Sequence, residues 1–403
     1  MKSNLLWSIS MTLTLTATVL VKAQEPDLSR MYVHPPIQVA NVPQNPSAPP
    51  GILPAQLKAA YGFNQVPNQG QGQTIALVDA YDDPNISSDL AFYQAYFHLG
   101  SCNFQKVIVG NPLQGQGWDL EESLDVEQAC ALASRANIIL IEANSDSLSD
   151  MLAAVQVAIA APYNASVVSM SWGYPEFSGE QNYDSYFCNI SNANGPVTFV
   201  AASGDSGHAI FFPTVSRCVV SAGGTTLTLS TVAPLSNPLQ LDYGRETAWD
   251  GSSGGISEYE SGLSWQDGIF QGCGTNGMRC VPDISSLSNS NPGVPVYDTL
   301  GYGGWVLVGG TSVASPDWAS FFTLVNSMRA AADPPKGTLS QAAQDLYAIY
   351  NSPNYLLDFH DITDGSNGNC GIDCVAGPGY DLVTGIGSYQ ANRLAPVLVA
   401  DPN

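Results

Sequence analysis

Continuous apolar runs of strand length recur along most of this chain and alternate with stretches of helical pattern. The runs are TIALVDAY, NIILIEAN, SVVSMSW, VTFVAASGD, CVVSAGG and GWVLVGG, at residues 74–81, 137–144, 166–172, 197–205, 218–224 and 304–310. A strand that is covered on both faces is apolar throughout, whereas a strand with one solvated face alternates. The pattern therefore predicts an α/β fold with a doubly wound parallel sheet flanked by helices.

Ligands of such sheets bind beyond the carboxyl ends of the strands. Four residues with functional side chains lie at the carboxyl ends of these runs or directly after them, namely Asp79, Trp172, Asp205 and Ser312. These residues are the first candidates for a functional site.

The charge of the chain restricts its partners. The 403 residues include 12 Lys and Arg against 35 Asp and Glu, for a formal net charge of -23. Nucleic acids and anionic membranes are thereby excluded as main partners, because both attract basic surfaces. Protonation of carboxylates would relieve the self-repulsion, so the composition suits an acidic working environment.

The N-terminus is typical of an exported protein. Residues 1–23 contain the basic Lys2, an apolar run and small residues near a cleavage position, and we interpret them as a secretory signal peptide. Residues 24–51 are rich in proline and lack periodicity, which predicts a linker or a short prosegment. No other stretch reaches about 18 uninterrupted apolar residues, so we expect a secreted, soluble protein without a membrane partner.

The eight cysteines form an even set, which in an exported chain indicates disulfides rather than metal ligands. Zinc would require paired spacings that this sequence lacks. We expect sequential neighbours to pair: Cys102 with Cys130, Cys188 with Cys218, Cys273 with Cys280, and Cys370 with Cys374.

Ser312 stands in VLVGGTSVASPDWAS, residues 306–320, where a buried strand gives way to a helix. Serine is a preferred helix N-cap, so a purely structural role explains the residue. A helix N-terminus also favours developing negative charge, and Gly309 and Gly310 allow the backbone to pass close to another group. This stretch alone leaves the cap and the nucleophile open.

A serine nucleophile needs a base, and the usual base is histidine. Of the four histidines, His34 lies in the predicted linker and His360 beside a possible calcium loop. His98 and His208 lack the His-Gly context of a subtilisin. A triad based on histidine is therefore not expected.

Carboxyl groups offer another base. Residues 117–141 predict a helix of about four turns that runs into a strand, with Glu121 and Asp125 on one face. Like charges at this spacing destabilise a helix by about 0.2 to 0.5 kcal/mol, so helix stability does not explain the pair. Acidic residues in the first turn of a helix complement its dipole. This role explains Asp119, Glu121 and Glu122 better than it explains Asp125. Two adjacent carboxyls share a proton, which raises one pKa and suits a base that works in acid.

Asp205 lies in SGDSG after an apolar run. An aspartate in that position ordinarily caps a turn. A protonated carboxyl can instead donate a hydrogen bond to an oxyanion, and low pH would supply the proton. The predictions for Ser312, Glu121 and Asp205 thus share one condition, acidity.

These motifs resemble those of the sedolisins, the serine-carboxyl peptidases related to subtilisin. The resemblance covers nearly the whole mature chain, and it rests on EESLD, SMSWG, SGDSG, GGTSVASP and FHDIT...AGPGYDLVTGIGS at residues 121–125, 169–173, 203–207, 309–316 and 359–388. It implies a subtilisin-like fold in a single large peptidase domain over residues 52–397.

The resemblance also implies catalytic roles. Ser312 would be the nucleophile, Glu121 the general base and acid, and Asp125 the carboxyl that orients Glu121. Asp205 would donate to the oxyanion. The family extends its carboxyl chain to an acidic residue and a tryptophan, which correspond here to Asp79 and Trp172.

A calcium ion in the C-terminal loop is likewise implied by the resemblance. Carboxylates would come from Asp361 and Asp381, and backbone carbonyls from Ile362, Gly377 and Gly379. Calcium prefers such oxygen donors, although DITDGSNGN is also the composition of ordinary turns. This calcium would be one structural ion.

The sequence departs from the family in two respects. Sedolisins usually carry a large N-terminal prodomain, whereas about 30 residues separate the predicted signal from the predicted domain here. We expect this short segment to be clipped or retained. Gly309 replaces a residue that is often serine in the family, a change that should not abolish the chemistry.

We therefore expect a secreted, monomeric, acid-acting endopeptidase that acts on proteins or peptides. Two alternatives remain. Some relatives are peptidases that remove tripeptides from free N-termini. A calcium-stabilised binding protein without activity is the other alternative, and the intact set of Ser312, Glu121, Asp125 and Asp205 argues against it.

Overall fold

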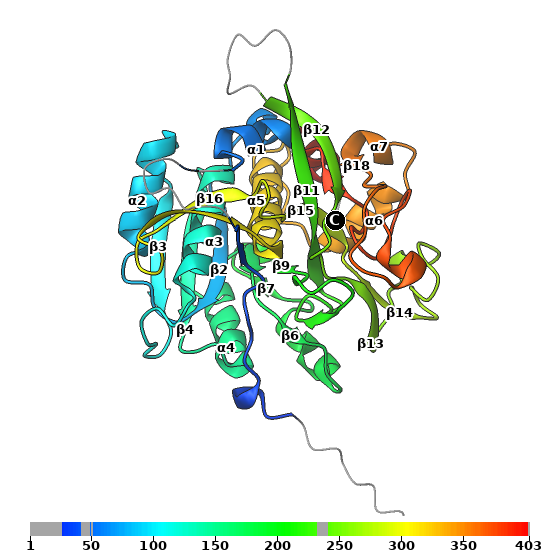
Figure 1. Ribbon diagram of the computed structural model, residues 1–403, viewed down its shortest axis with the longest axis horizontal. Helices are drawn as coiled ribbons and strands as arrows, with labels where there is room; N and C mark the ends of the chain where they lie inside the picture. The colour runs from blue at the N-terminus through cyan, green and yellow to red at the C-terminus, as the bar shows by residue number, and fades with distance from the viewer. Residues whose placement is uncertain (1–25, 42–48, 50, 232–240, 402–403) are drawn as a thin grey trace, which may run out of the picture.

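The computed structural model describes residues 26–41, 49, 51–231 and 241–401. Its main sheet has the strand order β12-β11-β9-β5-β2-β4-β3, with β15 beside β11 (Figure 1). These strands are β2 (Thr74–Ala80), β3 (Asn103–Ile108), β4 (Asn137–Ala143), β5 (Val167–Met170), β9 (Thr198–Ala202), β11 (Val219–Thr231), β12 (Leu241–Ala248) and β15 (Ile284–Leu287). All neighbours in this sheet are parallel except β11 and β12.

The chain winds outward from β2 in both directions. It first forms β3 and β4 on one side of β2, and then β5, β9 and β11 on the other side. Such a reversal of strand order opens a crevice at the carboxyl ends of the strands. The predicted doubly wound α/β fold is confirmed.

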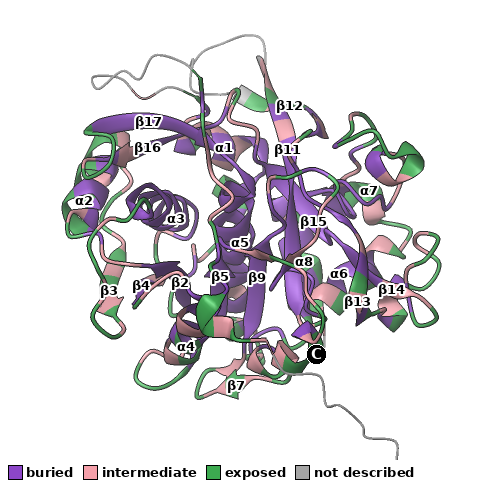
Figure 2. Cartoon of the chain, turned by 60° about the horizontal axis from the view of Figure 1, so that its bottom comes forward, coloured by how far each residue is buried: buried purple, intermediate pink, exposed green. Residues whose placement is uncertain are grey.

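Helices cover both faces of this sheet. On one face lie α1 (Pro54–Ala60), α3 (Asp119–Leu132), α5 (Thr311–Ala330) and α8 (Ala391–Ala400), and on the other lies α4 (Leu148–Ile159). The helix α5 packs against α3 and against β5, β9 and β11. It is buried along nearly its whole length, as Figure 2 shows. A central buried helix explains why its sequence lacks a polar face.

The run at residues 304–310 does not join the parallel sheet, contrary to our expectation. It forms β17 (Gly304–Gly309), which pairs antiparallel with β16 (Val294–Asp298) and with β1 (Gln38–Val39). The helices α2 (Ile86–Phe97) and α3 pack against β16. A continuous apolar run reports burial on both faces and does not report the direction of the neighbouring strand.

The remaining elements lie around the sheet. They are the helices α6 (Ala342–Tyr350) and α7 (Tyr355–Asp358), the pair β13 (Gly255–Ser261) and β14 (Met278–Val281), and the two-residue strands β6 (Tyr174–Pro175), β7 (Ser191–Asn192), β8 (Gly195–Pro196), β10 (Phe211–Phe212), β18 (Phe359–His360) and β19 (Ser388–Tyr389). Short 3-10 helices are η1 (Leu28–Arg30), η2 (Phe63–Gln65), η3 (Glu180–Tyr186), η4 (Ser264–Gln266) and η5 (Gly371–Cys374).

The four disulfides join the sequential pairs that we expected. They are Cys102–Cys130, Cys188–Cys218, Cys273–Cys280 and Cys370–Cys374. The first connects the residue before β3 to the last turn of α3.

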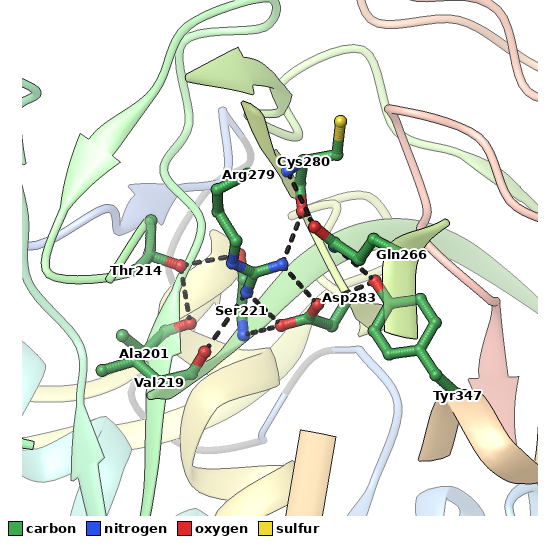
Figure 3. A network of polar contacts seen from close by, with 9 residues as sticks. All are labelled: Ala201, Thr214, Val219, Ser221, Gln266, Arg279, Cys280, Asp283 and Tyr347. Atoms are coloured by element: carbon green, nitrogen blue, oxygen red, sulfur yellow. Dashed lines mark hydrogen bonds and ion pairs between the residues drawn. The ribbon is translucent and has the colours of Figure 1, made fainter. Parts of the chain in front are cut away.

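A buried ion pair joins the sheet to its neighbours (Figure 3). Arg279 Nη2 lies 2.6 Å from Asp283 Oδ2, and both side chains are almost inaccessible to solvent. The Asp283 carboxylate also accepts from the backbone N–H of Ser221 at 2.8 Å and from the Tyr347 hydroxyl at 2.8 Å. These contacts tie β11, β14 and α6 together, and they satisfy a charge that would be costly if left unpaired.

The predicted signal peptide, residues 1–23, lies outside the described residues, as does part of the predicted linker or prosegment at 24–51. Where that segment is described, over residues 26–41, it contains η1 and β1 and lies against the domain. No helix within the described ranges is both long and apolar enough to span a bilayer.

Candidate active site

The packing of α3 against α5 brings Glu121, Asp125 and Ser312 to the same end of the sheet. All three side chains are fully buried. The Ser171 hydroxyl, just beyond β5, donates to Asp125 Oδ1 at 2.9 Å and lies 3.5 Å from the backbone oxygen of Ser312. Ser171 thus links the acidic helix α3 to the start of α5.

The carboxyl of Glu121 holds a proton more tightly than an ordinary glutamate. Burial raises its pKa well above the usual value, the charge of Asp79 raises it further, and the nearby Ser312 hydroxyl lowers it. Burial, followed by the charges of Asp79 and Glu121, likewise raises the pKa of Asp125. Within the described part of the chain, the two Glu121 oxygens and the Ser312 hydroxyl have no hydrogen-bond partner of good geometry. In particular, no described histidine is bonded to Ser312.

Asp79 extends this group of carboxyls into the sheet. It lies near the end of β2, opposite Glu142 of β4. Burial, and then the charge of Glu142, raises the pKa of Asp79 to about 8. Trp172 is fully buried beside it and donates its indole N–H to the carbonyl of Val78 at 2.9 Å, so the tryptophan contacts the strand next to Asp79 through the backbone.

Beyond Asp79, the cluster of buried carboxyls contacts one lysine. Lys106 Nζ lies 3.0 Å from Glu142 Oε1 and also pairs with Asp82. Glu122 belongs to the same buried region, and burial followed by the charge of Glu142 raises its pKa. The charge of Lys106 is therefore shared among several carboxyls, and protons must neutralise the others.

Asp205 approaches Ser312 from the other side, after β9. Its Oδ1 accepts from the Thr311 backbone N–H at 2.8 Å and from the Thr311 hydroxyl at 3.0 Å. Its Oδ2 has no partner among the described residues. Burial raises the pKa of Asp205 to about 7, against the lowering effect of Thr311. A protonated Oδ2 would be available to donate beside Ser312.

Two glycines shape the backbone before Ser312. Gly310 has φ of 112°, and a Cβ there would lie 2.0 Å from the carbonyl oxygen of Pro36 and 2.8 Å from Asp205 Oδ2. A Cβ at Gly309 would lie 2.2 Å from the backbone nitrogen of Ser290. A serine at 309, common in the family, would therefore clash with this chain's backbone unless that loop moved.

Sequence reasoning missed two hydroxyls that hold the acids. Ser171 binds Asp125, and Thr311 binds Asp205. Both lie inside motifs quoted above, SMSWG and GGTSVASP. Their presence in those motifs is the one sign in the sequence that they belong to the site. Their bonding partners are set by tertiary packing and could not be inferred from spacing.

The residues expected at a calcium site lie together in the C-terminal loop. The Gly379 N–H donates to both carboxylate oxygens of Asp361 at 3.1 Å, and the Gly377 N–H donates to Asp381 Oδ2 at 3.0 Å. Both carboxylates thus hold the same turn. Neither takes part in an ion pair with Lys or Arg in the described ranges.

Comparison with known proteins agrees with this geometry. The family model described as "Subtilase family" matches residues 125–346, which is more than half of the chain. The chain belongs to the subtilase family, in its sedolisin branch. Kumamolisin of a Bacillus species is 31% identical over 88% of this chain. Sedolisin of a Pseudomonas species is 27% identical over 86% of it.

The solved structure of Pseudomonas sedolisin, a serine-carboxyl proteinase complexed with two molecules of pseudo-iodotyrostatin, superimposes with a TM-score of 0.71 at 25% identity. It covers 89% of this chain and 100% of that one. A further relative is tripeptidyl-peptidase sed4 of Aspergillus fumigatus, 25% identical over 94% of this chain and 72% of its own length. The chain spans 64% and 61% of the lengths of kumamolisin and sedolisin.

The raised pKa values predict the pH dependence of stability. Asp79 titrates at about 8 in the folded protein against an ordinary value of 3.8, so between these values the folded state holds a proton that the unfolded chain has released. Raising the pH through this window should therefore lower the free energy of unfolding. Denaturant unfolding measured from about pH 4 to about pH 8 should show a falling midpoint.

The variant Asp79→Asn should reduce the pH slope of the unfolding free energy by up to about one proton per molecule. It should be relatively more stable than the parent at the alkaline end of the window. An unchanged slope in this variant would show that Asp79 does not carry the proton.

Proposed function

We propose that this protein is a serine-carboxyl peptidase that hydrolyses peptide bonds in proteins at acidic pH through an acyl-enzyme on Ser312. The observation that carries the proposal is the buried Ser312 hydroxyl beside Glu121, whose pKa is raised by burial and neighbouring acids. A carboxyl in this setting can exchange a proton with the serine under acid conditions.

In the first step, the carboxylate form of Glu121, with the shared proton held by Asp125, accepts the proton of Ser312 as Oγ attacks the substrate carbonyl. The same proton then goes to the nitrogen of the leaving amine, which breaks the peptide bond. Water attacks the resulting ester with Glu121 again as the base, and the serine regains its proton. Asp125 orients Glu121 and shares its proton, and the Ser171 hydroxyl holds Asp125 in place at 2.9 Å.

The negative oxygen of the tetrahedral intermediate would lie between Asp205 and the backbone N–H of Ser312. Thr311 fixes Asp205 Oδ1, and this leaves Oδ2 to donate when protonated. The N-terminal end of α5 adds favourable electrostatics at the same point. Removal of one such donor typically lowers kcat by roughly 10² to 10³.

We further propose that the C-terminal loop binds one structural calcium ion. Asp361 and Asp381 present two carboxylates to one turn without a basic partner in the described chain, and this supports a compensating cation. With the carbonyls of Ile362, Gly377 and Gly379 they form an all-oxygen donor set, which calcium prefers. The ion would stabilise the loop and take no part in the chemistry.

The expected setting is outside the cell. The signal-like residues 1–23 support export, the excess of acidic residues supports work at low pH, and the substrates would be proteins or peptides. We propose a monomer.

The variants Ser312→Ala and Glu121→Gln should each lower kcat on a protein substrate by at least on the order of 10⁴-fold at about pH 3 to 5. Each removes one partner of the proton exchange. The matched control is Ser320→Ala, the same change further along α5, and it should keep its activity. Circular dichroism should show all three variants folded. A folded parent protein without activity would favour the binding-protein alternative.

A tripeptidyl-peptidase is the second candidate, because one relative bears that name. The course of residues 31–36 supports the endopeptidase. The Pro36 carbonyl accepts from the Ser312 N–H at 3.2 Å, and the chain before it is bonded to Asp146 and Gly173. More than three residues thus lie on this side of Ser312, whereas removal of a tripeptide needs room for three.

Matched peptides with a free and an acetylated N-terminus separate the two activities. An endopeptidase should cleave both at similar rates, because it does not need the substrate amine. Mass spectrometry of the products would give the cut positions. Hydrolysis restricted to the free peptide, with release of tripeptides, would establish the exopeptidase instead.

Chelation should lower the melting temperature if the loop binds calcium. Free calcium at about 100 times Kd contributes about 2.7 kcal/mol of stability, which a chelator would remove. The double variant with Asp361→Asn and Asp381→Asn should lose this response. The control Asp364→Asn, exposed in the same loop and paired with Arg245, should retain it. A parent protein that does not respond to chelator contradicts the site.

A further inference from the structure

A cavity lies at the end of the sheet opposite to the candidate active site, and we call it the distal cavity. Its volume is about 770 Å³, and its wall includes Thr198, the first residue of β9, and Val220, near the start of β11. Asp205 of the candidate active site instead follows the carboxyl end of β9. Cavities of about 300 to 1,000 Å³ are typical of sites for small organic molecules.

The helix α5 connects the two ends of the sheet. Ser312 lies in its first turn, whereas Asn326 in its second half accepts the N–H of Leu339 through Oδ1 at 2.9 Å. Leu339 directly precedes the segment 340–344 that lines the distal cavity. At 1.5 Å per residue, Asn326 lies roughly 21 Å from Ser312 along the helix axis. The distal cavity is therefore separate from the candidate active site.

Two buried hydrogen-bonding groups in its wall have no partner among the described residues. Thr198 is 4% exposed, and its hydroxyl is unpaired. Its side chain projects from β9 on the same face as Val200, which is the face against which Trp265 packs. The Trp265 indole N–H is also buried and unpaired, and Trp265 lines the distal cavity. Since an unpaired buried donor is costly, a ligand that brings an acceptor would be favoured.

The N-terminus of α6 supplies further donors. Gln341, Ala342, Ala343 and Gln344 line the distal cavity, and α6 begins at Ala342. The first N–H groups of a helix have no intrahelical acceptor, and the Gln341 side chain does not cap them. A helix N-terminus of this kind favours an anionic group.

One arginine adds a full positive charge at the rim. Arg217 lines the distal cavity, is exposed, and forms no ion pair in the described ranges. The nearby Asp184 also lines it, and its carboxylate accepts from the Ser216 hydroxyl. Burial raises the pKa of Asp184, whereas the Ser216 hydroxyl and the charge of Arg217 lower it. The guanidinium of Arg217 thus remains available to an anion.

The remaining wall is apolar and covalently fixed. Phe187, Val197 and Phe199 contribute apolar side chains. The disulfide between Cys188 and Cys218 joins the segment after η3 to the residue before β11, and both cysteines line the distal cavity. A ligand therefore meets donors on one side and a rigid apolar surface on the other.

From this combination we infer that the distal cavity binds a small organic acid, with its carboxylate at Arg217 and the start of α6 and its apolar body against Phe187 and Phe199. A free apolar amino acid and the C-terminal end of a short peptide share this chemistry. The carboxylate accepts from the guanidinium and from the helix N–H groups, and the indole N–H of Trp265 and the Thr198 hydroxyl supply further bonds. The inference goes beyond the proposed function and does not depend on it.

Isothermal titration calorimetry of the full chain with N-acetyl-L-phenylalanine tests the inference. At about pH 5 the probe is ionised, because an α-carboxyl titrates at about 3.3 to 3.7. We expect one saturable site with Kd below about 1 mM. The amide of the same probe, which has no charge, should bind at least about tenfold more weakly. The absence of saturable binding, or equal binding of the amide, overturns the inference.

A matched pair of arginine variants tests the position. Arg217→Gln should weaken binding by roughly ten- to a hundredfold, because it removes hydrogen bonds to a charged group. Arg135→Gln, the same change at an exposed arginine outside the distal cavity, should bind as the parent does. Both variants should keep the parent melting temperature, since both side chains are exposed. Unchanged affinity in Arg217→Gln would place the probe elsewhere and overturn the inference.

The variant Thr198→Val separates binding from a structural role of the hydroxyl. It keeps the shape of the side chain and removes an unpaired buried group, so its melting temperature should equal or exceed that of the parent. Its affinity for the probe should fall by about threefold or more. A lower melting temperature with unchanged affinity would show a structural hydroxyl and contradict its assignment to the ligand.

Two further arms identify the source of the ligand and exclude the active site. Tighter binding of free phenylalanine would support amino acids as the source, and tighter binding of N-acetyl-phenylalanine would support peptide C-termini. Ser312→Ala should bind the probe as the parent does, so the result stands even if the proposed peptidase activity fails. Loss of binding in Ser312→Ala would place the probe in the active site and overturn the inference.

Discussion

The burial of several carboxyl groups with too few cations is the constraint on which the rest of this site depends. Glu121, Asp125 and Asp79 lie in the interior where α3 meets the sheet. Within the described chain none of them forms an ion pair, whereas Lys106 pairs with Glu142 and Asp82. Water cannot solvate these acids, so the folded state must keep protons on them. The fold therefore keeps the group partly protonated, so that one proton can be shared between neighbouring carboxyls while another carboxyl accepts a proton as base.

The arrangement of the elements follows from the same need for burial. The central helix α5 is enclosed by α3, α8 and the sheet, so Ser312 enters the interior at its first turn. Parallel strands that end together place Asp79 and Asp205 near that turn, beside Glu121. Hydroxyls of Ser171 and Thr311 then satisfy one oxygen of Asp125 and of Asp205, and leave the others for chemistry.

Much of this architecture could be predicted from the sequence. Apolar runs located β2, β4, β5, β9 and β11, and the spacing of Glu121 and Asp125 placed both on one helix. The direction of β17 could not be predicted, because apolar content is the same in both kinds of sheet. The course of residues 31–39 was also missed. A proline-rich segment has no period of its own, and its structure comes from the backbone groups of the cleft that it pairs with.

The disulfide between Cys102 and Cys130 has a mechanical consequence. Cys130 lies in the last turn of α3, the helix that carries Glu121 and Asp125, and Cys102 directly precedes the edge strand β3. The covalent link fixes the axial register of α3, so the helix cannot slide along the sheet without breaking strand pairs between β3 and β4. Glu121 and Asp125, which repel each other whenever both lose their protons, are thereby held in place along the helix axis relative to the sheet. Reduction of this disulfide would remove the covalent restraint on the helix that carries both acids.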